Sequence, residues 1–281
     1  MTEKIYVLLP VYNRREITRR FIECLKAQTY ENYQLILIDD GSTDGTAEMV
    51  LGYLPETVVL RGKGNWWWAG SLQQGIEWLK NEHVADDSVI LMINDDTVFE
   101  PDFLATAVEV LSGVTEALLL AQCYSLQDNK LVDAGVHVDW RRLTFEQART
   151  EEEINCFSTR GLFMRMKDLR AVGDFHPRIL PHYASDYEFT IRAHRKGLKL
   201  MTDSRLKIWE DEETTGHHSI NGLTLWSSIK IIFSKKSVWN PFYWAVFVVL
   251  SCPSPLILKN LVRVFYRALR LIFFPPYKKG K

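Results

Sequence analysis

Short apolar segments alternate with amphipathic segments of helical periodicity through the first 115 residues, and this alternation constrains the fold more than any other feature. Buried-strand patterns occupy residues 5–9, 34–38, 58–60 and 89–93. Helical patterns occupy residues 16–27, 71–80 and 102–111, and the segment STDGTAEMV starts a further helix. Because units this short connect through right-handed crossovers, the pattern predicts an α/β fold with a Rossmann-like, mostly parallel sheet flanked by helices.

The pattern is less regular after residue 115. Residues 117–123, 131–138 and 162–166 are strand-like, and residues 187–196 form a helical pattern that ends at Gly197. The charged segment 139–154 has no clear period and is interpreted as a mobile loop. We therefore predict one main domain over residues 1–220 and an apolar, amphipathic helical extension over residues 221–281.

Charge is distributed unevenly along the 281 residues, although the formal net charge is only −1. Residues 259–281 contain seven Lys or Arg and no acid, so the rest of the chain carries a net charge of −8. An acidic body repels phosphate backbones, which argues against nucleic acid as a partner. The four cysteines form no metal or redox motif, and the first apolar run is too short for a secretory signal. These features favour a cytoplasmic protein.

Polar side chains follow three of the predicted strands at the point where each strand ends. They are Tyr12 and Asn13, next to Pro10, after the first strand, Asp39 and Asp40 after the second, and Asn94, Asp95 and Asp96 after the fourth. Ligands of open α/β sheets bind at the carboxyl ends of the strands, so these side chains are expected to converge on one site. Adjacent carboxylates repel unless a cation compensates them, and carboxylate oxygens suit Mg²⁺ or Mn²⁺. A single Asp-Asp pair, however, is also common in solvated turns.

Six motifs occur in the order typical of one enzyme family: PVYNR, QTY, LIDDGSTDGT, GNWWWAGSLQQGI, LMINDDT and PHYASDYEFTIRAHRKG. Over residues 4–215 the chain thereby resembles the family 2 glycosyltransferases, which have the GT-A fold. The resemblance implies inverting transfer of a sugar from a nucleotide-diphosphate sugar donor to an acceptor, with a divalent cation, Mn²⁺ or Mg²⁺, as cofactor. It further implies a nucleotide-binding half at residues 1–115 and an acceptor-binding, catalytic half at residues 116–220.

The resemblance also implies roles for the residues at the strand ends. Pro10, Tyr12, Asn13 and Arg14 are expected to line the nucleotide pocket, and Asp39 and Asp40 to reach the base or ribose, with contributions from Asn94 and Asp95. The segment Asn94-Asp95-Asp96 occupies the position of the family's DxD motif. Asp96 is then the main metal ligand and Asp95 shares this role, while Asn94 in place of the first Asp implies weaker metal affinity.

Asp186 is the candidate general base, because inverting displacement needs a group that takes the proton of the acceptor hydroxyl. Its alternative role is that of a helix N-cap, and Glu188 is a lesser candidate for the base. Arg192 is expected either to contact the diphosphate or to pair with Glu188 one turn earlier.

Three further segments carry candidate contacts. Trp67 and Trp68, in a run of three tryptophans, are expected to contact the donor or to enter the core. Arg160 and Gly161 are candidates for contact with the acceptor or the sugar. His217 could bind the metal or the diphosphate from a closing loop, although adjacent histidines in a polar loop are more often simply exposed.

The C-terminal segment has features of a membrane-associating element. Residues 237–258 are uncharged but interrupted by prolines, and Lys259, Arg263, Arg267 and Arg270 share one face of the next helix. This pattern favours a segment that lies on an anionic membrane rather than spanning it. The alternative is an apolar hairpin that packs on the main domain or forms a homodimer interface.

The sequence thus predicts an enzyme on the inner face of the cell membrane, acting on a glycan acceptor that is polyprenyl-linked, in the synthesis of surface polysaccharide. Two other functions remain open. One is a nucleotidyltransferase acting on sugar phosphates, although PVYNRRE lacks the glycines that such enzymes place after the first strand. The other is a non-catalytic module that binds a sugar nucleotide or glycan at the membrane. The identity of the base and the sugar depends on pocket shape.

Overall fold

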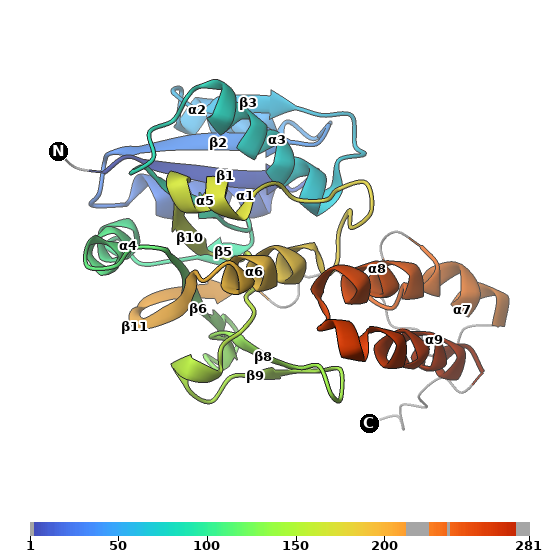
Figure 1. Cartoon of the computed structure of the whole chain (residues 1–281). Helices are drawn as coiled ribbons and strands as arrows, with labels where there is room; N and C mark the ends of the chain where they lie inside the picture. The colour runs from blue at the N-terminus through green and yellow to red at the C-terminus, as the bar shows by residue number, and fades with distance from the viewer. Residues whose placement is uncertain (1–2, 212–224, 235–236, 274–281) are drawn as a thin grey trace.

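The computed structural model describes residues 3–211, 225–234 and 237–273 (Figure 1). Within these residues, nine strands form one mixed sheet in the order β3-β2-β1-β4-β10-β6-β11-β5, and β7 pairs with β6 off this path. The first half of the sheet is parallel and matches the predicted strands: β1 (Ile5–Val11), β2 (Tyr33–Asp39), β3 (Val58–Arg61) and β4 (Val89–Met92). The α/β fold predicted from the alternation of strands and helices is therefore confirmed.

Helices cover both faces of this sheet. One face carries α1 (Arg15–Lys26), α2 (Thr46–Tyr53) and α4 (Phe103–Ser112), and the other carries α3 (Trp67–Asn81), α5 (Met166–Val172) and α6 (Ser185–Arg195). Val7 and Leu91 enter the first core, whereas Leu8 and Met92 enter the second. Because successive strand residues face opposite layers that are both apolar, these strands appear in the sequence as continuous apolar runs.

The second half of the sheet is mixed rather than parallel. It comprises β6 (Ala117–Ser125), β7 (Leu131–Asp133), β10 (Leu162–Arg165), β11 (Lys199–Glu210) and the two-residue β5 (Thr97–Val98). β10 runs antiparallel between β4 and β6, and β11 is parallel to β6 but antiparallel to β5. Because β10 is antiparallel to β4, the chain that precedes β10 lies at the carboxyl-end edge of β1 and β4. The twelve-residue β11 was not among the predicted strands.

Two predictions for the middle of the chain are wrong. The predicted strand 131–138 is broken at Gly135, where φ is +107°, into β7 and β8 (Val136–Asp139). The predicted loop 139–154 contains β9 (Thr144–Gln147), which pairs with β8, and a 3₁₀ turn at Glu151–Glu153. β9 is half-buried or exposed throughout, and its four residues, with Glu146 and Gln147 exposed, are too few and too polar to show a strand pattern.

The C-terminal helices pack beside α6 and the β8–β9 hairpin, at the right of Figure 1. They are α7 (Leu225–Ile232), α8 (Pro241–Ser251) and α9 (Ile257–Phe273). Asn240 caps α8 by accepting the backbone N–H of Phe242 at 3.0 Å, and Pro241 occupies the first turn. Phe247 and Val264 are buried with Leu143 of the main domain. One face of the hairpin thus packs on the main domain, as in the alternative derived from the sequence.

No helix in the described ranges combines the length and the apolar character that a membrane crossing requires. The predicted domain boundary at residue 220 falls within residues 212–224, outside the described residues.

Candidate active site

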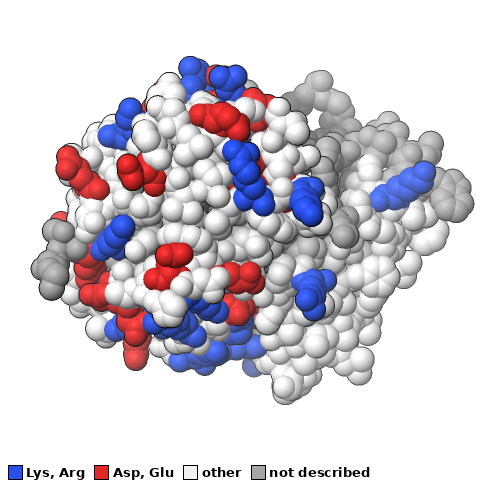
Figure 2. All heavy atoms as spheres, turned by 90° about the horizontal axis from the view of Figure 1, so that it is seen from above, with Lys and Arg blue, Asp and Glu red and all other residues white. Residues whose placement is uncertain are grey.

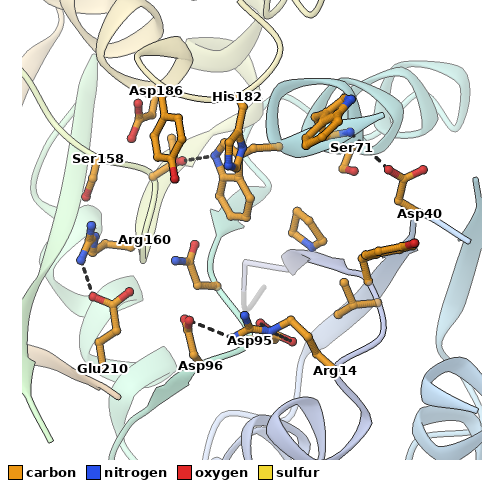
Figure 3. A pocket seen from close by; sticks show the side chains of 18 of the residues that line it. Arg14, Asp40, Ser71, Asp95, Asp96, Ser158, Arg160, His182, Asp186 and Glu210 are labelled. Atoms are coloured by element: carbon orange, nitrogen blue, oxygen red, sulfur yellow. Dashed lines mark hydrogen bonds and ion pairs between the residues drawn. The ribbon is translucent and has the colours of Figure 1, made fainter. Parts of the chain in front are cut away.

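A cleft of about 640 Å³ opens at the carboxyl ends of β1, β2 and β4 (Figure 3). It brings together most of the predicted site residues: Pro10, Tyr12, Arg14, Asp40, Trp67, Trp68, Asn94, Asp95, Asp96, Arg160 and Asp186. The parallel half of the sheet supplies one wall, and the loop before β10, the start of α6 and the end of β11 supply the other. Residues separated by up to 200 positions in the sequence therefore share one site.

Asn13 and Asp39 do not line the cleft but hold the loop that forms its edge. The backbone N–H of Asn13 donates to Ser42 Oγ at 2.9 Å, and Asn13 Oδ1 accepts the N–H of Thr43 at 2.8 Å. Asp39 is 2% exposed, and its Oδ1 accepts the N–H of Ser42 at 2.7 Å. Asn13 ties the chain after β1 to the loop after β2, and Asp39 ties the end of β2 to the same loop, so both side chains position the cleft wall.

Gly161 and Arg192 also lie outside the cleft lining. Gly161 has φ of +99°, and a Cβ there would come within 3.1 Å of Ile208, so this glycine permits close packing between strands. Arg192 forms a bidentate pair with Glu188, at 2.8 and 2.9 Å, and donates to the carbonyl oxygens of Val172 and Asp174. Its donors therefore join α6 to α5, which is the pairing alternative rather than a diphosphate contact. His217 lies outside the described residues.

Asp40 lines the cleft with a carboxylate that is already committed to the main chain. Its two oxygens accept the backbone N–H groups of Gly64, Asn65, Trp66 and Trp67 at 2.8–3.2 Å. These bonds fold the glycine-containing turn back over the end of β2 and start α3 beside the cleft. Trp67 and Trp68 reach the lining as a result, and Trp68 Nε1 donates to Thr159 Oγ1 at 3.0 Å.

The acidic pair after β4 is compensated by one arginine. Arg14 Nε lies 2.9 Å from Asp95 Oδ1, and Arg14 Nη2 lies 2.9 Å from Asp96 Oδ2. Thr18 Oγ1 donates to Asp95 Oδ2 at 2.8 Å, so both oxygens of Asp95 are occupied. Burial raises the pKa of Asp95 to about 6, despite the opposing effect of Arg14. Of the two acids, only Asp96 retains an oxygen without a hydrogen-bond partner among the described residues.

The residues present fit a hard divalent cation. Asp96 Oδ1 and Asn94 Oδ1 are both buried, and neither has a hydrogen-bond partner among the described residues. A carboxylate and an amide oxygen are suitable donors for Mn²⁺ or Mg²⁺, which take their other ligands from water and phosphate. The described part of the chain holds no group of three or more His, Cys, Asp or Glu arranged as a complete metal site. The protein would therefore supply a partial ligand set that a diphosphate completes.

Asp186 lies across the cleft from this acidic pair (Figure 3). Ala184, with φ of +63°, is the residue that caps α6, so Asp186 belongs to the first turn and is not the N-cap. Burial raises the pKa of Asp186 to about 6, although the N–H of Tyr187, which donates at 2.9 Å, acts in the opposite sense. A carboxylate with this pKa is mostly ionised at pH 7 and remains basic enough to accept a proton.

Arg160 links the remaining acids of the cleft. It pairs with Glu210 at the end of β11, and its Nε lies 4.0 Å from Asp133, which also accepts Ser158 Oγ at 2.7 Å. Burial alone would lower the pKa of Arg160, but Glu210 and Asp133 outweigh it and raise that pKa.

Several lining residues were missed in the sequence. They are Gly64, Ser71, Ser158, Thr159, His182, Tyr183 and Glu210. His182 and Tyr183 stand inside the motif PHYASDYEFT, so their position beside Asp186 could have identified them. The sequence feature that could have identified Glu210 is the set of alternating apolar residues near the end of β11, which predicts a strand that ends at this acid.

Comparison with known proteins agrees with this geometry. The family model described as glycosyl transferase family 2 matches residues 6–173. An uncharacterized glycosyltransferase of Rickettsia typhi is 27% identical over 127 residues, which is 45% of this chain and 38% of that protein. The match therefore spans well under half of that relative's length.

Two solved structures share the fold. The Pyrobaculum calidifontis mannosyltransferase PcManGT, in complex with GDP-Man and Mn²⁺, has a TM-score of 0.59 at 16% identity, covering 96% of this chain and 76% of that one. S. aureus TarS 1-349, in complex with UDP-GlcNAc, has a TM-score of 0.61 at 15% identity, covering 96% and 73%. The match to the family model extends over more than half of the sequence, and we conclude that this chain belongs to glycosyl transferase family 2 and has the GT-A fold.

Proposed function

We propose that the protein transfers a sugar, with inversion, from a nucleotide-diphosphate sugar to a hydroxyl group of a glycan acceptor. The observation that carries the proposal is a single cleft with one carboxylate on each side. Asp96, on one wall, has an oxygen without a hydrogen-bond partner among the described residues, and Asp186, on the other wall, has a raised pKa. A sugar nucleotide held between them would present its anomeric carbon toward Asp186. The nucleotide sugars in the PcManGT and TarS complexes support a donor of this class.

In this mechanism Asp186 accepts the proton of the acceptor hydroxyl as the new glycosidic bond forms. The nucleoside diphosphate leaves from the opposite side of the sugar. A divalent cation held by Asp96 and Asn94 would supply positive charge for the leaving diphosphate when it is bound. Arg14 holds both carboxylates of the Asp95–Asp96 pair in position through two ion pairs. Pro10, Tyr12 and the turn at Gly64 would hold the nucleoside, because they form the wall nearest β1 and β2.

A panel of nucleotide sugars incubated with the protein and Mn²⁺ or Mg²⁺ tests the proposal. Release of nucleoside diphosphate that stops on addition of EDTA is the expected result. Pyrophosphate as the product would instead indicate a nucleotidyltransferase. Donor binding without any product, with or without candidate acceptors, would indicate a binding module and would contradict the proposal.

The acceptor, we further propose, is presented at an anionic membrane, and the C-terminal helices dock there. Leu258, Val262, Phe265 and Leu269 form a stripe along α9 in which each residue is at least 42% exposed. Residues 225–281 contain ten Lys or Arg and no acid. Figure 2 shows the same contrast, because red and blue residues are mixed over the main body while the helices at the right carry no red. An exposed apolar stripe flanked by cations suits a lipid surface.

The structure changes which residues of α9 would contact lipid. Arg263 donates to the carbonyl oxygen of Arg141, and Arg267 donates to that of Leu143 at 3.0 Å, so both arginines hold the helix on the main domain. The apolar stripe lies on a different side and is left to solvent. Flotation of the full chain with phosphatidylglycerol vesicles, compared with the triple variant L258S/V262S/F265S, tests this docking. Equal binding by both proteins would contradict it, and a dimer lost in the variant would indicate a homodimer interface.

A further inference from the structure

We propose that Glu210, at the end of β11, is a second carboxylate ligand of the divalent cation, opposite Asp96. The proposal deepens the sugar transfer described above and depends on it for the identity of the cation as a cofactor. Glu210 lines the cleft, is 2% exposed and belongs to neither the DxD segment nor any motif recognised in the sequence. Its candidacy follows from the strand pairing, from its unsatisfied oxygen and from the local charge.

The backbone brings Glu210 beside the acidic segment. β11 pairs antiparallel with β5, and in this register Glu210 is directly opposite Thr97, the residue after Asp96. The N–H of Asp211 donates to the carbonyl oxygen of Asp96 at 3.4 Å, so the ladder continues one residue further. Figure 3 shows the carboxyl groups of Glu210 and Asp96 at the same end of the cleft. Two acids separated by 114 positions in the sequence are thus neighbours.

Each of these two carboxylates has one oxygen bound to an arginine and one oxygen unsatisfied. Asp96 Oδ2 pairs with Arg14, and Glu210 Oε2 pairs with Arg160. Asp96 Oδ1 and Glu210 Oε1 are both buried and have no hydrogen-bond partner among the described residues. Buried carboxylate oxygens without a partner are unfavourable, and two of them close together also repel each other. A cation between them would remove both penalties.

The local charge agrees with a divalent ion. Arg14 contacts Asp95 and Asp96, and Arg160 lies within 4.0 Å of Glu210 and Asp133. Two arginines therefore face four carboxylates, which leaves two negative charges when all are ionised. One divalent cation balances them. The buried Asn94 Oδ1, also without a partner among the described residues, supplies a third oxygen of the type that Mn²⁺ and Mg²⁺ prefer.

Titration of the full chain with Mn²⁺ alone tests this site without requiring turnover. Binding is measured as the loss of the electron paramagnetic resonance signal of free Mn²⁺. Glu210→Gln and Asp96→Asn should each weaken Mn²⁺ binding by about tenfold or more. Asp133→Asn is the matched control, since Asp133 neighbours the same arginine but already accepts hydrogen bonds from Gly135 N–H and Ser158 Oγ. Asp133→Asn removes the same charge as Glu210→Gln but no proposed ligand, so it should weaken Mn²⁺ binding clearly less than Glu210→Gln does. Thermal melting of each variant reports whether it folds.

If Glu210→Gln does not fold, Glu210→Asp is tested instead. It keeps the charge near Arg160 but shortens the side chain by one methylene, so it should also weaken Mn²⁺ binding. Wild-type affinity in the folded Glu210 variant, or no Mn²⁺ binding by the unmodified protein at millimolar concentration, would overturn the proposal. If the Glu210 variant binds Mn²⁺ normally but has a raised KM for the acceptor, the proposal is likewise overturned, and Glu210 would instead contact the acceptor. Release of nucleoside diphosphate by the unmodified protein tests the sugar transfer separately, so the two proposals can fail independently.

Discussion

Replacing Asp186 with asparagine should stabilise the folded protein at pH 8 while removing turnover. Burial raises the pKa of Asp186 from its usual 3.8 to about 6, so the folded state binds this proton more tightly than the unfolded chain does. The native protein consequently loses stability as the pH rises from 3.8 to 6. Linkage gives a penalty of about 3 kcal/mol at pH 8 and about half as much at pH 5. Asparagine carries no charge and can still accept the N–H of Tyr187.

The expected gain in the free energy of unfolding is therefore about 2–3 kcal/mol at pH 8, because solvent in the cleft reduces the full value, and about half of that at pH 5. Urea unfolding followed by tryptophan fluorescence at the two pH values measures it. Glu188→Gln is the matched control, since Glu188 is also an acid of α6 and is 4% exposed. Its carboxylate is paired with Arg192, so its loss should destabilise the protein by about 1–3 kcal/mol at both pH values.

The reasoning is refuted if Asp186→Asn is no more stable than the unmodified protein at pH 8 while Glu188→Gln behaves as expected. That result would mean that Asp186 is well solvated in the folded state. Asp186 would then be a poor candidate for the base, because its basicity in the mechanism comes from desolvation. If Asp186→Asn is stabilised but turnover is unchanged, the burial argument holds and Asp186 is not the base.

Other consequences of the structure can be measured in the same preparations. kcat/KM should decline about tenfold per pH unit below about pH 6, as Asp186 becomes protonated, and a rate that is constant down to pH 5 would contradict this. Gly62→Ala should weaken donor binding and destabilise the protein by about 1–3 kcal/mol, because the new Cβ would lie 2.6 Å from Asp40 Oδ1. Gly52→Ala is the control: Gly52 lies in α2 with open space around its Cβ, so this change should stabilise the protein by about 0.5–1 kcal/mol. Trp68→Phe removes the hydrogen bond to Thr159 and should cost about 1 kcal/mol in thermal or urea unfolding.

The strands of the first half could be predicted because their physical signal is local. Residues 5–9, 34–38, 58–60 and 89–93 were expected as strands, and β1 to β4 contain them all but for Ile93, which follows the end of β4. A strand buried on both faces must be apolar at every position, and the acids that follow it stand out by contrast. Asp40 and Asp96 could thus be assigned to one sheet edge from the sequence alone.

The second half could be predicted only in part. The strands expected at residues 117–123 and 162–166 correspond to β6 and β10, whereas the strands that were missed are short or irregular. β11 has a register shift between Asp203 and Lys207, which breaks its alternation, and several of its residues are charged and exposed. The β8–β9 hairpin packs Phe145 against Tyr187 of α6 and Phe247 of α8 and leaves Glu146 and Gln147 to solvent. With β11 unrecognised, Glu210 could not be placed beside Asp96.

The sequence alone does not show which charged residues pair with one another, and this pairing determines which oxygens are available to a cation. Arg14 meets Asp95 and Asp96 across 81 and 82 positions, and Arg160 meets Glu210 across 50. The strand order brings these residues together. β10 lies between β4 and β6, so Arg160, just before β10, lies near the end of β11. Net charge gives only the sum of these groups. The pairing occupies both oxygens of Asp95, while Asp96 and Glu210 each keep one oxygen without a hydrogen-bond partner among the described residues, and these two oxygens are the ones most open to a cation.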